Sequence, residues 1–150
     1  MLSRKAALLL ILAACCTLFG AEVLARPMRA ECTGPAAPGE QFLGQVTPAE
    51  ANTLLKVFGQ SKRFLLLDVR TESEYEAGHL AGSRQLDFYA PDFPKLLAAI
   101  PRDVVILVYC ASGNRSKQTM TMLGSLCFPV VLDLQGGVKR WVGEGYPLVQ

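Results

Sequence analysis

The fold is decided by one stretch, VILVYCASGNRSKQT, which occupies residues Val105–Thr119. Its first five residues are apolar and mostly β-branched or aromatic, as in a strand that is buried on both faces. Small and polar residues follow Cys110, and residues 116–126 then have the composition of a helix. The stretch therefore predicts a buried strand that ends in a cysteine and turns tightly into a helix.

The same alternation continues on both sides of this stretch. Phe64–Val69 and PVVLDL (residues 129–134) are further short apolar runs of the buried-strand type, and SRQLDF (83–88) is a candidate short strand. Thr47 and Glu50 have the spacing of a helix capping box. Helices are expected from Pro48 to just before Gly59, and at 71–78, 92–101 and 137–143. Strands that alternate with helices predict an α/β domain with an open, mainly parallel sheet and helices on both faces.

The N-terminal segment has the pattern of an export signal, with Arg4 and Lys5 followed by the uncharged run Ala6–Ala21. That run is shorter than the roughly 20 apolar residues of a membrane-spanning helix. Two processing sites fit: cleavage after Ala25, or lipidation of the cysteine in Leu-Ala-Ala-Cys, which ends at Cys15. Both predict an exported, periplasmic protein, attached to the membrane only if it is lipidated or keeps its signal.

After a signal peptide at 1–25, we expect an irregular arm at 26–45 and one folded domain at 46–150. The chain has 15 Lys and Arg against 13 Asp and Glu, without a basic block, which argues against binding to nucleic acid. His79 is the only histidine and there is no CxxC pair, so we expect no metal site. Neither a metal nor an organic cofactor is expected, and the protein is expected to be a monomer.

The residues after Cys110 predict an anion-binding loop. Residues 111–114 are small or tolerate positive φ, so the backbone can curl and point its amides inward ahead of a helix. Amides and the helix dipole favour a thiolate, the nucleophilic form of cysteine. Arg115 adds a cation that can bind an oxyanion. The alternative is that Cys110 is a small buried apolar residue.

Three stretches, in this order, resemble the rhodanese family of single-domain sulfurtransferases over roughly residues 46–149. LLLDVRTESEYEAGHLAGS (65–83) resembles the first family segment, YCASGNRS (109–116) the active-site loop, and LDLQGGVKRWVGEGYPL (132–148) the closing segment. The matching positions outside the loop are Asp68, Arg70, Glu74, His79, Gly136, Gly137, Trp141 and Pro147.

This resemblance implies a rhodanese-like fold and covalent sulfur transfer. Cys110 would take sulfur from a small anionic donor such as thiosulfate and pass it, as a persulfide, to a thiol or cyanide. The substrate-binding residues would be Ala111, Ser112, Gly113, Asn114, Arg115 and Ser116. Structural support would come from Asp68, Arg70, Glu74 and His79, with Asp68 and Arg70 forming a charge pair near Glu74.

Several alternatives stay open. The domain could be a non-catalytic carrier or sensor of sulfane sulfur that binds a partner protein. Phosphatase or arsenate reductase activity is disfavoured, because the related phosphatases have one more residue between cysteine and arginine than the six-residue loop here. His79 could pair with the thiol, and Cys32 could resolve Cys110 as in an oxidoreductase. Cys127 is expected to be a small buried apolar residue.

Overall fold

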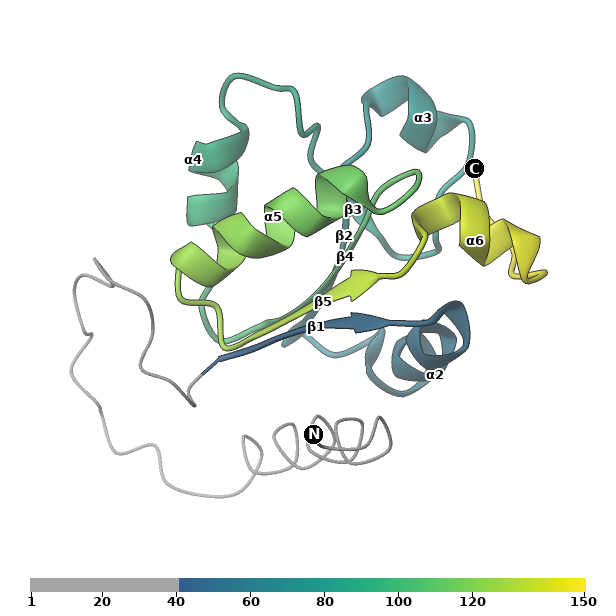
Figure 1. Ribbon diagram of the computed structural model, residues 1–150, viewed down its shortest axis with the longest axis horizontal. Coiled ribbons are helices and arrows are strands. Elements are labelled where there is room, and N and C mark those ends of the chain that lie inside the picture. The colour runs from purple at the N-terminus through teal and green to yellow at the C-terminus, as the bar shows by residue number, and fades with distance from the viewer. Residues whose placement is uncertain (1–40) are drawn as a thin grey trace. The chain divides into compact units, whose positions relative to one another are not determined.

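A computed structural model describes residues 41–150, which contain a five-stranded, all-parallel sheet (Figure 1). The strand order is β1-β5-β4-β2-β3. The strands are β1 (Phe42–Val46), β2 (Phe64–Asp68), β3 (Arg84–Gln85), β4 (Val105–Tyr109) and β5 (Val130–Leu134). The predicted fold class is confirmed. The export signal, both processing sites, Cys15 and Cys32 lie outside the described residues.

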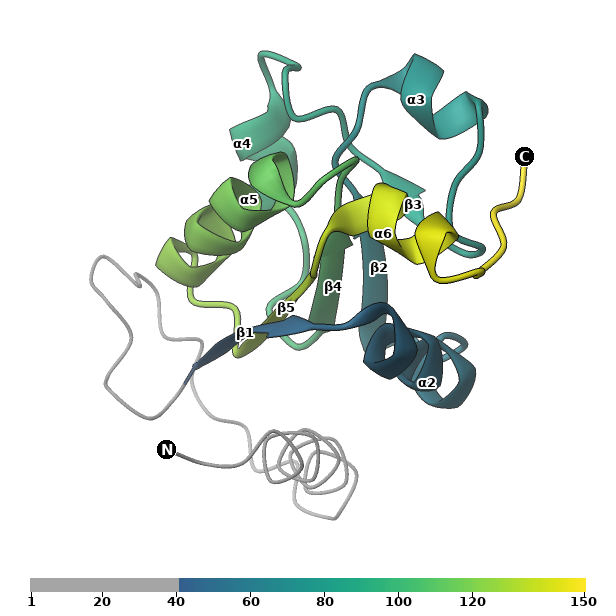
Figure 2. The ribbon, with the colours of Figure 1, turned by 45° about the vertical axis from the view of Figure 1, so that its right-hand side comes forward.

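Helices cover both faces of this sheet, as Figures 1 and 2 show. They are α2 (Pro48–Phe58), α3 (Glu72–Glu76), α4 (Phe93–Ala98), α5 (Asn114–Ser125) and α6 (Gly137–Gly143). α4 and α5 pack on one face, and α2 and α6 lie on the other. Within residues 41–150, no helix combines the length and the apolar character needed to cross a membrane.

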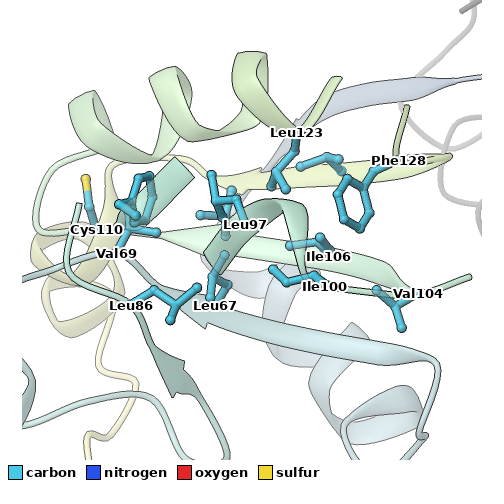
Figure 3. Packing of buried hydrophobic residues seen from close by; sticks show 13 residues of the cluster. Leu67, Val69, Leu86, Leu97, Ile100, Val104, Ile106, Cys110, Leu123 and Phe128 are labelled. Atoms are coloured by element: carbon cyan, nitrogen blue, oxygen red, sulfur yellow. The ribbon is translucent and has the colours of Figure 1, made fainter. Parts of the chain in front are cut away.

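The core on the α4 and α5 face leads directly to the cysteine. Leu67, Ile106 and other strand residues on this face pack against Leu97 of α4 and Leu123 of α5. Figure 3 shows Cys110 at one end of this cluster, opposite Phe128. The thiol therefore sits where a rigid, close-packed core meets the loop that enters α5.

Two reciprocal capping boxes fix the starts of α2 and α3. The Thr47 side chain accepts from the Glu50 amide, while the Glu50 carboxylate accepts from the Thr47 amide, as predicted. Thr71 and Glu74 repeat this arrangement at α3. The second box holds Glu74 in a defined position beside the carboxyl ends of the central strands.

The domain begins earlier than the sequence analysis placed it, because residues 42–45 form part of β1 rather than an irregular arm. β1 pairs in parallel with β5 over its whole length, from Phe42 opposite Val130 to Val46 opposite Leu134. The Gln41 side chain also donates to the carbonyls of Gly124 and Phe128. An edge strand is held mainly by backbone hydrogen bonds, so FLGQV shows no continuous apolar run.

Candidate active site

Cys110 follows the last residue of β4, the point where ligands bind in open parallel sheets. Its side chain is 1% exposed and is a free thiol. The loop turns at Gly113, which has φ 101° and caps α5. The Gly113 amide donates to Cys110 Sγ at 3.1 Å, and Ser116 Oγ lies 3.6 Å from the same sulfur. The predicted loop therefore curls around the thiol.

Hydrogen bonds to the sulfur outweigh the effect of its burial. Burial alone raises the pKa of the Cys110 thiol, because it disfavours the charged form. The amides of Ser116, Ser112 and Gly113, together with the Ser116 hydroxyl, lower the pKa to below its ordinary value. The thiolate, which is the nucleophilic form, is thus favoured at this position.

Arg115 is held by Glu74 in a two-point ion pair. Arg115 Nη1 donates to Glu74 Oε2 and Nη2 donates to Oε1, both at 2.7 Å. The guanidinium lowers the pKa of Glu74 to about 2, and the pKa of Arg115 is raised. Glu74 was expected beside Asp68 and Arg70, but it instead connects α3 to the active-site loop. The exposed ring of Tyr89 lies 5.6 Å from the Arg115 guanidinium carbon.

Asp68 and Arg70 form the expected charge pair, and it is buried. Arg70 Nη2 donates to Asp68 Oδ2 at 2.6 Å and to the Gly78 carbonyl at 2.8 Å. The pair thereby fixes the turn that leads to His79. The His79 ring stacks on Tyr75 at 3.8 Å between centroids, and its backbone bridges to Val149. These contacts give Asp68, Arg70 and His79, three of the four predicted support residues, a structural role.

The N-terminus of α6 holds the other side of the loop. The Val138 amide donates to the Cys110 carbonyl at 2.9 Å, and the Lys139 amide donates to the Ala111 carbonyl at 3.0 Å. This approach requires glycine at position 137, where φ is +58° and a Cβ would lie 2.2 Å from the Cys110 carbonyl oxygen. The Gly-Gly pair of the closing segment therefore allows a helix end to pack directly on the active-site backbone.

The domain matches a known protein family over most of its length. The family described as rhodanese-like domain matches residues 49–144, which is more than half of the chain. The chain belongs to the rhodanese family. A sulfurtransferase of Allochromatium vinosum is 31% identical over 104 residues, which are 69% of this chain and 95% of that relative.

Other rhodanese relatives agree in sequence and in structure. Thiosulfate sulfurtransferase GlpE of Stutzerimonas stutzeri is 33% identical over 78 residues, covering 51% of this chain and 69% of the relative. The crystal structure of a rhodanese-related protein from Thermoplasma volcanium has a TM-score of 0.60 and 28% identity. It covers 70% of this chain and 96% of the other. The family match and the two sulfurtransferase relatives place the chain in the general sulfurtransferase class.

Within the rhodanese loop, the structure divides the predicted binding residues by role. The amides that bond to the sulfur belong to Ser112, Gly113 and Ser116. Ala111 instead faces α6 through its carbonyl, and Asn114 is exposed as the first residue of α5. Ser112, Gly113 and Ser116 therefore contact the thiol directly, and Arg115 acts on it through its charge.

The sequence led to a wrong prediction for Cys127 and to no prediction for Asp133. Cys127 is only half-buried at φ 63° and is disulfide-bonded, so it is not the buried apolar residue that was expected. Asp133, near the end of β5, is fully buried close to Ser116 and was not singled out. Over residues 41–150, no group of three or more His, Cys, Asp or Glu side chains is arranged to hold a metal ion.

Proposed function

We propose that this rhodanese domain transfers sulfane sulfur from thiosulfate to cyanide or a thiol through a persulfide on Cys110. The observation that carries the proposal is a free thiol of lowered pKa at the carboxyl end of β4, bonded by inward-pointing amides. Sulfurtransferase names among the relatives support the reaction class, and GlpE, a thiosulfate sulfurtransferase, supports this donor.

In the first step, the Cys110 thiolate attacks the outer sulfur of thiosulfate. A bond forms between Sγ and that sulfur while the sulfur–sulfur bond of thiosulfate breaks, and sulfite leaves with the electron pair. The product is a persulfide anion on Cys110. The amides of Ser112, Gly113 and Ser116, at the N-terminal end of α5, stabilise negative charge at this position.

In the second step, the acceptor attacks the outer sulfur of the persulfide. With cyanide, a carbon–sulfur bond forms, the bond between Sγ and the outer sulfur breaks, and Sγ leaves as a thiolate. The hydrogen bonds that lower the pKa of Cys110 also make its thiolate a better leaving group. The same hydrogen bonds therefore assist both steps, and two products leave in turn, as in ping-pong kinetics.

Arg115 contributes its positive charge, and its terminal nitrogens are not free to bind a substrate oxyanion at two points. Both of its terminal nitrogens donate to Glu74, so they are engaged before a donor arrives. Negative charge on Cys110 is among the causes that raise the pKa of Arg115, which means that the guanidinium favours an anion at the sulfur. We infer that Arg115 attracts anionic donors electrostatically, while Glu74 holds it in place.

Steady-state kinetics with thiosulfate and cyanide test this function. We expect parallel double-reciprocal lines, the pattern of a ping-pong mechanism, and loss of turnover in Cys110→Ser with an unchanged circular dichroism spectrum. Turnover that persists in Cys110→Ser would rule out the mechanism. A wild-type protein that loads sulfur but does not release it to cyanide or to small thiols would instead be a sulfur carrier.

A further inference from the structure

A buried carboxyl group that the proposed mechanism does not use lies in the strand next to Cys110. Asp133 of β5 pairs in register with Val108 of β4 and with Gln45 of β1. Its side chain is 0% exposed, and Gln45 Nε2 donates to its Oδ2 at 2.7 Å. Its Oδ1 has no hydrogen-bond partner among the residues that the structure describes. Buried carboxyl oxygens are rarely left without a partner, so this one needs an explanation.

Ser116 lies beside the thiol, and its side chain also acts on this carboxyl group. The serine is 0% exposed, and its Oγ is 3.6 Å from Cys110 Sγ. Its hydroxyl also faces Asp133, where it acts to lower the pKa of the carboxyl group. A hydroxyl has only one proton, so Ser116 cannot donate to the sulfur and to the carboxylate at the same time. The protonation state of Asp133 therefore decides where the Ser116 proton points.

The net effect of the surroundings on Asp133 is a shift toward its neutral form. Burial raises the pKa of Asp133 above its ordinary value, against the opposing effects of Ser116, Gln45 and the charge of Lys117. Arg115 interacts electrostatically with Cys110 and is already paired with Glu74. An ionised Asp133 would place a second buried negative charge near the Cys110 anion, which a neutral acid avoids.

We propose that Asp133 is a positioning residue: as a neutral acid it donates from Oδ1 to Ser116 Oγ, so that the Ser116 hydroxyl donates to Cys110 Sγ. This arrangement gives Oδ1 a hydrogen-bond partner and completes a chain from Gln45 through Asp133 and Ser116 to the sulfur. It rests on the proposed role of Cys110 as nucleophile and leaving group, because a fixed donor at Sγ assists both steps.

Alkylation of Cys110 by iodoacetamide, followed by mass spectrometry of its peptide across a pH series, tests the proposal without sulfur transfer. Asp133→Asn keeps a donor and a neutral charge, so we expect its alkylation midpoint to stay within about 0.3 pH unit of the wild type. Asp133→Leu removes the donor, and we expect the midpoint to rise by about one pH unit. In a Ser116→Ala background, Asp133→Leu should have no further effect.

Two results would overturn the proposal. One is a midpoint in Asp133→Asn that moves as far as in Asp133→Leu, because the ionised carboxylate would then be the active form. The other is an effect of Asp133→Leu that persists at full size in Ser116→Ala, because Asp133 would then not act through Ser116. Circular dichroism and thermal unfolding check that each variant is folded.

Infrared spectroscopy supplies a second test that does not depend on Asp133→Leu folding. The wild type should show a carboxylic acid band at neutral pH that is missing from Asp133→Asn, and absence of that band from the wild type would refute the neutral acid. Sulfur transfer is measured separately, with an expected loss of about tenfold in kcat/KM for Asp133→Leu. If the wild type transfers no sulfur but the alkylation results hold, the proposed function fails while the positioning role stands.

Discussion

Replacing Gly137 with alanine should destabilise the protein by more than the backbone strain of a left-handed alanine, because it also detaches the active-site loop from α6. In this variant the new Cβ would lie 2.2 Å from the Cys110 carbonyl oxygen and 2.8 Å from the Ala111 carbonyl carbon. Both contacts are with backbone, so no flexible side chain can move aside. The loop and α6 must separate, which breaks the bonds from the Val138 and Lys139 amides to the loop carbonyls.

Gly82→Ala is the matched control for this variant. Gly82 also has positive φ, +78°, but a Cβ there meets nothing within 4 Å. Alanine in the left-handed region costs about 1 to 2 kcal/mol at either position. Only Gly137→Ala also loses two backbone hydrogen bonds, at about 0.5 to 1.5 kcal/mol each. The free energy of unfolding should therefore fall by about 1 to 3 kcal/mol more in Gly137→Ala than in Gly82→Ala.

Urea denaturation measures this difference, and thiosulfate–cyanide turnover reports the state of the loop. We expect Gly137→Ala to lose most of its turnover, because displaced amides no longer surround Sγ, while Gly82→Ala keeps it. Equal unfolding free energies and equal turnover in the two variants would refute the role that we assign to the contact between α6 and the loop.

Further predictions concern the charges around the thiol and the start of the mature chain. Because the pKa of Glu74 is lowered from 4.5 to about 2, its ion pair stabilises the fold fully above about pH 4.5 and progressively less toward pH 2. The melting temperature of Glu74→Gln should therefore fall less with acid than that of the wild type, and identical pH profiles would contradict this pairing. Arg115→Ala should raise the KM for thiosulfate more than the KM for cyanide, whereas equal changes in both would argue against electrostatic attraction of the donor. Alkylation of Cys110 should show a midpoint below that of a free cysteine, and a midpoint at or above it would mean that burial dominates. Intact-mass analysis of the protein from its native host should give a chain that starts at Arg26 or at a lipidated Cys15, and an unprocessed chain would contradict the predicted export signal.

Most of the fold could be predicted because the central strands of a parallel sheet are buried on both faces. VILVY and VVLDL each read as nearly continuous apolar runs, and capping residues marked the starts of α2 and α3. β1 was not predicted, because an edge strand needs few apolar side chains, and only Val46 of its five residues is buried.

The parts of the site formed by residues adjacent in the sequence could be predicted. The parts formed by residues that only the fold brings together could not. Cys110, its amides and Ser116 lie in one short segment, so their spacing indicated a thiolate loop. The partner of Arg115 lies 41 positions away, and nothing in the sequence favours Glu74 over other acids. Asp133 appears as a polar interruption of an apolar strand, and only the sheet register places it near Ser116 and Cys110.

Mass spectrometry of the Cys110 peptide after thiosulfate treatment shows whether Cys110 carries sulfur as a persulfide. We predict that the peptide gains the mass of one sulfur atom, that cyanide removes this sulfur as thiocyanate, and that Cys110→Ser shows neither change. A Cys110 peptide of unchanged mass in a protein that still converts thiosulfate and cyanide would rule out the persulfide on Cys110.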